Sequence, residues 1–135
     1  MKRVLVAGVA LSLLAACETT SAAVSPRKHV VFFDWDRAAI TAQAAATVRT
    51  AADQAKAGGT VRVDIVGHTD TSGDTGYNMA LSIRRANAVK DELIRNGVNP
   101  QSIALAGKGE SQPLVATGDG VREPQNRRAE ITIVP

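Results

Sequence analysis

Aromatic residues and cysteine are scarce in this sequence of 135 residues, which has one Trp, one Tyr, two Phe and a single Cys. With so few rings, the hydrophobic core has to be built from Val, Ile, Leu and Ala. With one thiol, the chain cannot form an internal disulfide. The basic residues form no stripe interleaved with aromatics, which excludes the usual pattern of a nucleic-acid-binding surface. We therefore expect no nucleic-acid partner.

Long hydrophobic runs are also lacking, and the one uncharged apolar segment lies near the start. It covers Val4–Leu14, and at 11 residues it is shorter than the roughly 20 that a membrane-spanning helix needs. Lys2 and Arg3 precede it, and a basic start followed by a short apolar run is typical of an export signal. Removal of this signal would lower the formal net charge from +3 to +1, because both basic residues leave with it.

The segment Leu14–Cys17 closes this signal and resembles the lipobox of bacterial lipoproteins. In such proteins the cysteine is lipidated and becomes the first mature residue. Lipidation, rather than a free thiol in a soluble protein, would explain why the chain has one unpaired cysteine at this position. The resemblance implies a stable anchor of more than one acyl chain, and Glu18 fits sorting to the outer membrane. We expect a signal peptide over residues 1–16, lipidated Cys17 and a linker over 17–28, and one domain over 29–135.

The rest of the chain alternates between strand and helix patterns. Strand patterns occur at residues 30–33, 61–65, 103–105 and 129–133, and the first, Val30–Phe33, is apolar enough to be buried on both faces. Helical patterns occur at residues 40–55, ending at Gly58-Gly59, and at about 77–96, ending before Gly97. The order predicts an α/β fold of the β-α-β-α-β-β type, in which two helices cover a small mixed sheet.

A polar loop, Gly67–Asn78, joins the second strand to the second helix and contains Asp70. On a helical wheel Arg85 lies on the face directed at the sheet, whereas Arg84 lies on the polar face. A charged side chain on the sheet side must find a partner or a route to water. One interpretation is structural: Arg85 pairs with a carboxylate such as Asp70, or extends past the strand end to solvent. The other is functional: Arg85 presents its planar fork to a ligand carboxylate, while Asp70 receives the ligand's ammonium.

Asp70 also has a structural interpretation, as an Asx-type turn residue among Gly, Ser and Thr, and we prefer this interpretation for Asp74. Catalysis by His68, Asp70 and Ser72 is disfavoured, since alternate residues of one loop seldom face one another and no GxSxG elbow is present. A metal site made of His29, His68 and Asp70 lacks ligand spacing. We expect no enzyme, no metal and no other cofactor.

Several motifs in order resemble the OmpA-like C-terminal domain family, which includes the peptidoglycan-associated lipoproteins (Pal). They are Phe33-Asp34, Gly67-His68-Thr69-Asp70, Tyr77-Asn78, Leu81-Ser82, Arg85-Ala86, Gly107–Pro113 and Asn126–Ala129. The resemblance spans about residues 30–134 and implies non-covalent binding of peptidoglycan through the diaminopimelate of its stem peptide. It assigns the ligand ammonium to Asp70 and the ligand carboxylate to Arg85. Asp34, Asn126 and Arg127 resemble positions that border the groove.

The sequence thus predicts an outer-membrane lipoprotein, anchored through Cys17, whose periplasmic domain ties the membrane to the cell wall. The alternative is an interaction lipoprotein of the Tol–Pal type, in which the same surface docks Tol-system periplasmic proteins and wall binding is secondary. Phe32 and Phe33 are expected in the core, and Gly107 and Gly109 in turns.

Overall fold

The computed structural model describes residues 25–58 and 62–135. The predicted signal peptide, Cys17 and most of the predicted linker lie outside the described residues. The elements are β1 (Arg27–Phe32), α1 (Ala42–Ala57), β2 (Arg62–Gly67), α2 (Thr75–Arg95), β3 (Ile103–Gly107) and β4 (Arg128–Val134), with 3₁₀ turns at Pro100–Ser102 and Pro124–Asn126. This order confirms the predicted β-α-β-α-β-β arrangement. Within the described ranges, no helix has the length and apolar character needed to cross a membrane.

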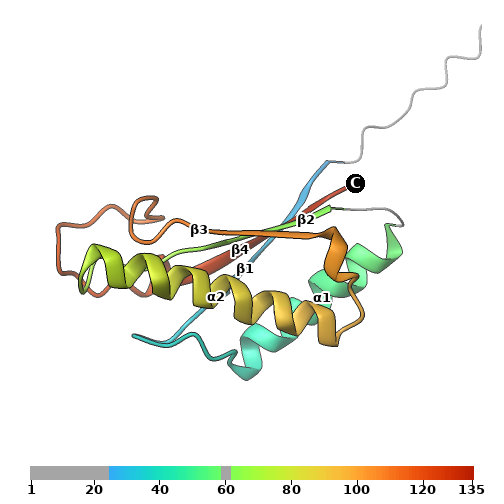
Figure 1. Cartoon of the computed structure of the whole chain (residues 1–135), viewed down its shortest axis with the longest axis horizontal. Coiled ribbons are helices and arrows are strands. Elements are labelled where there is room, and N and C mark those ends of the chain that lie inside the picture. Colours follow the sequence, from blue (N-terminus) through green and yellow to red (C-terminus); the bar gives the residue numbers. More distant parts are fainter. Residues whose placement is uncertain (1–24, 59–61) are drawn as a thin grey trace, which may run out of the picture.

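The four strands form one mixed sheet in the order β1-β4-β2-β3. β4 is antiparallel to both β1 and β2, whereas β3 is parallel to β2. Both helices lie on the same side of this sheet, as Figure 1 shows. α1 packs against β1 and β4, and α2 packs against β2, β3 and β4. The core between the layers is almost entirely aliphatic, as the scarcity of aromatics predicts.

The first strand differs from the prediction, because only one of its faces is buried. Val31 and Phe33 are 2% and 3% exposed, whereas Val30 and Phe32 are 38% and 48% exposed. Among the described residues, helices cover only one face of the sheet, and β1 is its edge strand, so alternate side chains of β1 point to the other face. The expectations of a strand buried on both faces, and of Phe32 in the core, were therefore wrong.

α2 begins and ends at residues suited to capping a helix. Asp74 is the N-cap, and its side chain accepts from the Gly76 N–H. The helix thus starts two residues earlier than the sequence pattern suggests, and Asp74 is a cap rather than a simple turn residue. At the other end Gly97 has a φ of +93°, and Val98 N–H donates to Leu93 O at 3.1 Å. This is a Schellman-type ending, which a glycine at this position favours.

Two glycines let α2 approach the ends of β2 and β3. A Cβ at Gly67 would overlap the Ser82 carbonyl oxygen, and a Cβ at Gly107 would lie 2.5 Å from Cγ1 of Ile83. Gly107 therefore serves close packing of helix on sheet rather than the turn that we expected from the sequence. The close approach brings the buried face of α2 directly over the end of β2, where the loop containing Asp70 begins.

Candidate functional site

Arg85 lies in the middle of α2 and is completely buried. Its Nε donates to Arg37 O at 2.9 Å, Nη1 to His68 O at 2.9 Å, and Nη2 to Asp34 O at 3.2 Å. The helical-wheel prediction is confirmed, since Arg85 faces the sheet while Arg84 is exposed. Three backbone carbonyls thus accept hydrogen bonds from three of the guanidinium's N–H groups. Two of its five N–H groups have no partner among the described residues.

Burial changes the titration of Arg85 but not its charge at neutral pH. Desolvation lowers its pKa to about 10, and the nearby Asp70 carboxylate opposes this decrease. The Cζ atom also lies 5.3 Å from the centre of the Phe33 ring, within cation–π range. Contrary to the structural interpretation, Arg85 neither forms an ion pair with Asp70 nor extends to solvent. It remains a fixed buried cation.

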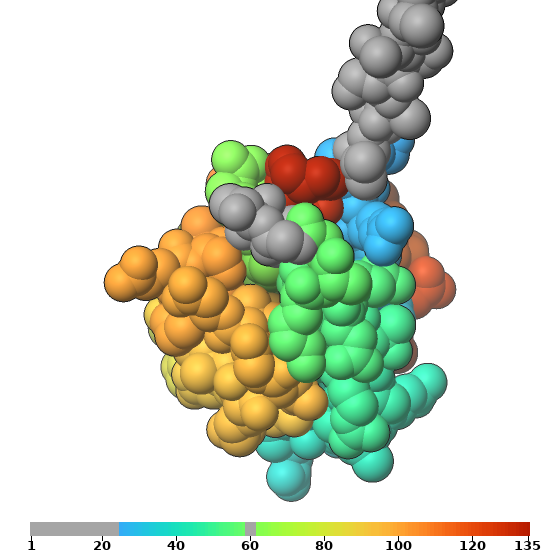
Figure 2. All heavy atoms as spheres, turned by 90° about the vertical axis from the view of Figure 1, so that its right-hand side faces the viewer, coloured from blue at the N-terminus to red at the C-terminus, as the bar shows by residue number. Residues whose placement is uncertain are grey.

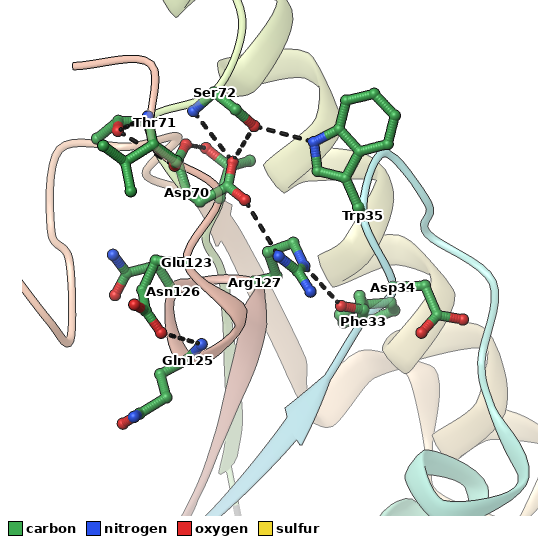
Figure 3. A network of polar contacts seen from close by, with 12 residues as sticks. Phe33, Asp34, Trp35, Asp70, Thr71, Ser72, Glu123, Gln125, Asn126 and Arg127 are labelled. Carbon is green, nitrogen blue, oxygen red and sulfur yellow. Dashed lines mark hydrogen bonds and ion pairs between the residues drawn. The ribbon is translucent and has the colours of Figure 1, made fainter. Parts of the chain in front are cut away.

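Asp70 follows the end of β2 and is 3% exposed. Its Oδ1 accepts hydrogen bonds from both the backbone N–H and the hydroxyl of Ser72, which is the Asx-type turn that the sequence suggests. Its Oδ2 lies 3.4 Å from Nη1 of Arg127, so the carboxylate is also one half of an ion pair (Figure 3). A carboxylate offers about four lone-pair sites, and these contacts occupy three of them.

Arg127 is the partner of Asp70, a role that the sequence did not reveal. It precedes β4, its side chain is 14% exposed, and its Nε donates to Phe33 O at 3.1 Å (Figure 3). The register explains the encounter, because Gly67 at the end of β2 pairs with Ala129 near the start of β4. Residues just after β2 and just before β4 are therefore neighbours in space. The order of the strands in the sheet was the missing information.

Asp70 and Arg85 line one cavity of about 330 Å³. Its walls are Trp35, Asp36, Asp70, Ser72, Gly73, Tyr77, Asn78, Leu81 and Arg85. The buried carboxylate of Asp70, the buried guanidinium of Arg85 and apolar side chains thus surround a single space. Such a cavity can hold a small zwitterion, with its ammonium near the acid and its carboxylate near the guanidinium.

Two half-exposed aromatic side chains, Trp35 and Tyr77, stand at this cavity. Trp35 donates its indole N–H to Ser72 Oγ at 3.1 Å, and Tyr77 donates its hydroxyl to Asp36. The hydrogen bond to Asp36 raises the pKa of Tyr77. Both bonds join the segment after β1 to residues that flank the start of α2. No sequence pattern pointed to Trp35 or Asp36, because their position depends on where β1 lies in the sheet.

The three residues predicted to border the ligand groove lie in different surroundings. Asp34 and Arg127 line a second groove of about 610 Å³, on the side of Phe32 and the start of α1. Asn126 is fully buried and lines neither space: its amide accepts from Val115 N–H and donates to Val115 O, both at 2.8 Å. Asn126 therefore holds the loop before β4 through Val115, and its place at the border of a ligand groove stays a prediction.

His68 is buried beside Arg128, Glu130 and Lys108, and no hydrogen bond joins it to Asp70 or Ser72 among the described residues. Burial and the two cations lower its pKa to about 4, although the Glu130 carboxylate, 3.8 Å from Nε2, acts in the opposite direction. His68 is neutral at pH 7. In the described ranges, no three His, Cys, Asp or Glu residues lie close enough together to hold a metal ion.

The fold and the cavity define a small α/β domain with a charged binding pocket at one end of a mixed sheet. The OmpA family model matches residues 32–127. The chain belongs to the OmpA family. This membership agrees with the prediction that the protein is not an enzyme.

This chain is similar to named relatives and to solved structures. An outer membrane protein of Gluconacetobacter diazotrophicus is 50% identical over 113 residues, covering 79% of this chain and 30% of that protein. A peptidoglycan-associated lipoprotein of Pseudomonas putida is 37% identical over 100 residues, covering 74% and 60%. The crystal structure of the peptidoglycan-associated lipoprotein from Burkholderia pseudomallei superposes with a TM-score of 0.71 at 31% identity, covering 77% and 88%. The chain spans less than two thirds of the length of these two sequence relatives.

Proposed function

We propose that this protein is an outer-membrane lipoprotein whose periplasmic domain binds peptidoglycan non-covalently through the diaminopimelate of the stem peptide. It would thereby tie the outer membrane to the cell wall. The observation that carries the proposal is that Asp70 and Arg85 line the same cavity. Membership of the OmpA family and similarity to proteins named as peptidoglycan-associated lipoproteins support it.

The free end of a diaminopimelate side chain carries one ammonium and one carboxylate. The carboxylate would accept from the two N–H groups that Arg85 does not spend on backbone carbonyls. The ammonium would donate to Asp70, beside the ion pair with Arg127. Leu81 supplies an apolar part of the wall for the methylene groups between these charges. Each charge-assisted contact contributes about 1.5–3 kcal/mol in a partly desolvated site.

The test is co-sedimentation of the full-length chain, in detergent, with sacculi that contain diaminopimelate. Asp70→Asn is the informative variant, because the amide keeps an oxygen for Ser72 while removing the charge that attracts an ammonium. Asp53→Asn is the matched control, since Asp53 is an exposed residue of α1 paired with Lys56 outside the cavity. We expect the wild type and Asp53→Asn to pellet, and Asp70→Asn to lose most of its binding.

Free diaminopimelate should release the pelleted wild type into the supernatant. Binding of Asp70→Asn at the wild-type level would contradict the proposed site. If the wild type itself stays in the supernatant, wall binding is not the function, and docking of Tol-type periplasmic proteins becomes the better candidate.

A further inference from the structure

The cation Arg122 lies against Trp35, which lines the cavity. The Cζ atom of Arg122 is 3.5 Å from the centre of the Trp35 ring, so the guanidinium covers the indole face. Trp35 is itself fixed, because its N–H bonds Ser72, which in turn bonds Asp70 (Figure 3). A continuous series of contacts leads from Arg122 to the acid of the proposed site.

The loop that contains Arg122 is attached to the loop that contains Asp70. Thr71 donates its hydroxyl to Gly118 O at 2.7 Å and accepts from Val121 N–H at 3.1 Å. Gly120 N–H donates to the Thr71 carbonyl at 3.0 Å. Thr71 thus anchors the residues just before Arg122 and fixes the position of that side chain over Trp35.

Stacking on Trp35 leaves the hydrogen-bonding edge of Arg122 available. A guanidinium stacked on a ring uses its face, whereas its N–H groups point outward in its own plane. Arg122 is exposed, and none of the ion pairs between described residues includes it. The nearby Glu123 carboxylate instead accepts from the Gln125 N–H. A planar cation is therefore held beside the cavity without an acidic partner among the described residues.

The charges that line the cavity, together with the charge of Arg127, which pairs with Asp70 from the neighbouring groove, balance without Arg122. Asp36 and Asp70 carry two negative charges, and Arg85 and Arg127 carry two positive charges. Arg122 adds a positive charge that neither the cavity nor a zwitterion within it would neutralise. A ligand that continues out of the cavity past Trp35 would therefore bind more tightly if its next group were an anion.

We propose that Arg122, held on Trp35, forms a second anion subsite for a free carboxylate on the stem residue next to the diamino acid. This inference rests on the proposed binding of diaminopimelate. Two carboxylates have the required chemistry: the α-carboxylate of the glutamate that precedes the diamino acid, and the terminal carboxylate of the residue that follows it. Amidation of the relevant carboxylate would remove its charge and weaken binding.

The experiment measures by calorimetry the affinity of the full-length chain, in detergent, for synthetic stem peptides. One peptide has both carboxylates free, a second has the glutamate amidated, a third has the terminal carboxylate amidated, and free diaminopimelate is the reference ligand. The chains are the wild type, Arg122→Gln, Arg122→Lys and the control Arg49→Gln. Arg49 is an exposed residue of α1, so this control makes the same charge change outside the site.

We expect amidation of one of the two carboxylates to weaken wild-type binding about threefold to tenfold, the range of a charge-assisted contact at a partly exposed site. The peptide that loses affinity identifies the bound carboxylate. Arg122→Gln should abolish this difference while leaving the affinity for free diaminopimelate unchanged. Arg122→Lys should restore part of the difference, because it keeps the charge and loses the planar fork. Arg49→Gln should behave as the wild type.

Two outcomes would overturn the inference. A wild type that binds all three peptides equally, or an Arg122→Gln variant that keeps the preference, would show that Arg122 holds no carboxylate. Failure of the wild type to bind any peptide or free diaminopimelate is a different result. It would overturn the proposed function and this inference together.

Discussion

At the scale of single residues, the two arginines at positions 84 and 85 show how one step along a helix changes the role of a side chain. Arg84 is exposed, with its Cζ 5.5 Å from the Tyr77 ring centre. Arg85 is buried and hydrogen-bonded to three carbonyls from two loops. The buried residue therefore has two functions, since it joins the loops after β1 and β2 and also forms part of the cavity wall.

Replacement of Arg85 should cost stability as well as binding. Arg85→Ala leaves three carbonyl oxygens without their donors, and a buried unsatisfied group costs about 1–3 kcal/mol. We expect a loss of about 3 kcal/mol or more in the free energy of unfolding, measured by denaturant melts. Arg84→Ala is the control and should cost about 0.5 kcal/mol or less, as exposed positions do. Equal losses for the two variants would contradict the assigned role of Arg85. For this reason Asp70→Asn, not Arg85→Ala, is the better probe of binding.

His68 should make the stability of the fold depend on pH. Its pKa is about 4 in the folded protein, against 6.5 for an unperturbed histidine. Between these two values the unfolded chain binds a proton that the folded chain does not, so stability falls as the pH falls from 6.5 towards 4. At pH 5 this difference in proton binding should lower the free energy of unfolding by about 1–2 kcal/mol relative to neutral pH.

Comparison with His68→Gln separates the effect of His68 on the pH dependence of stability from the effect of the Asp and Glu side chains. The variant cannot take up the proton, so its melting temperature should decline less steeply than that of the wild type between pH 6.5 and 4.5. The slope is informative even if the substitution lowers stability at every pH. Parallel pH profiles for the two proteins would show that His68 is not the titrating group. Arg128 and Lys108, which disfavour the charged form, and Glu130, which favours it, are unchanged in both.

At the scale of elements, the position of α2 depends on two glycines in the strands beneath it. The helix contributes Tyr77, Asn78, Leu81 and Arg85 to the cavity, so its distance from the sheet sets the geometry of the site. At Gly67 the helix backbone itself occupies the space that a side chain would need. A backbone contact cannot be relieved by a change of rotamer, so the whole helix would have to move.

Gly67→Ala should therefore strongly destabilise the protein, by about 3 kcal/mol or more, as overpacking against a rigid backbone does in severe cases. Gly118→Ala is the matched control, because a Cβ there would have no heavy atom of the described residues within 4 Å apart from those of its chain neighbours. The control should melt within a few degrees of the wild type. A Gly67→Ala protein that melts with the control would show that α2 can shift without cost.

At the scale of the whole molecule, the sequence predicts elements better than it predicts neighbours. Periodicity and capping residues located both helices and all four strands, and the wheel correctly turned Arg85 toward the sheet. Two failures have one cause, which is that sequence patterns do not show what lies against a given face. The pattern of β1 did not show that one of its faces is covered by neither α1 nor α2, so Phe32 was wrongly placed in the core. The pattern before β4 did not show that Arg127 would meet Asp70, while Asn126 would bond Val115.

β1 runs from one end of the domain towards the other. Arg27 at its start pairs with Ile133 near the C-terminus, and Figure 2 shows these two chain segments next to each other at one end of the molecule. The strand then runs towards the opposite end of the domain, as Figure 1 shows. Trp35 and Asp36, which follow the strand in the chain, line the cavity. β1 has six residues, and at about 3.3 Å each they place the two ends of the strand about 20 Å apart.

This arrangement has a mechanical consequence. If the domain is held by the chain that enters β1 and by a ligand in the cavity, tension between the two runs along the strand. Such a pull would slide β1 past β4, loading all six of their residue pairs together instead of peeling them apart one after another. A sheet loaded in shear yields only when many hydrogen bonds break at once. The edge strand would therefore carry the tension between the chain that enters β1 and the ligand in the cavity.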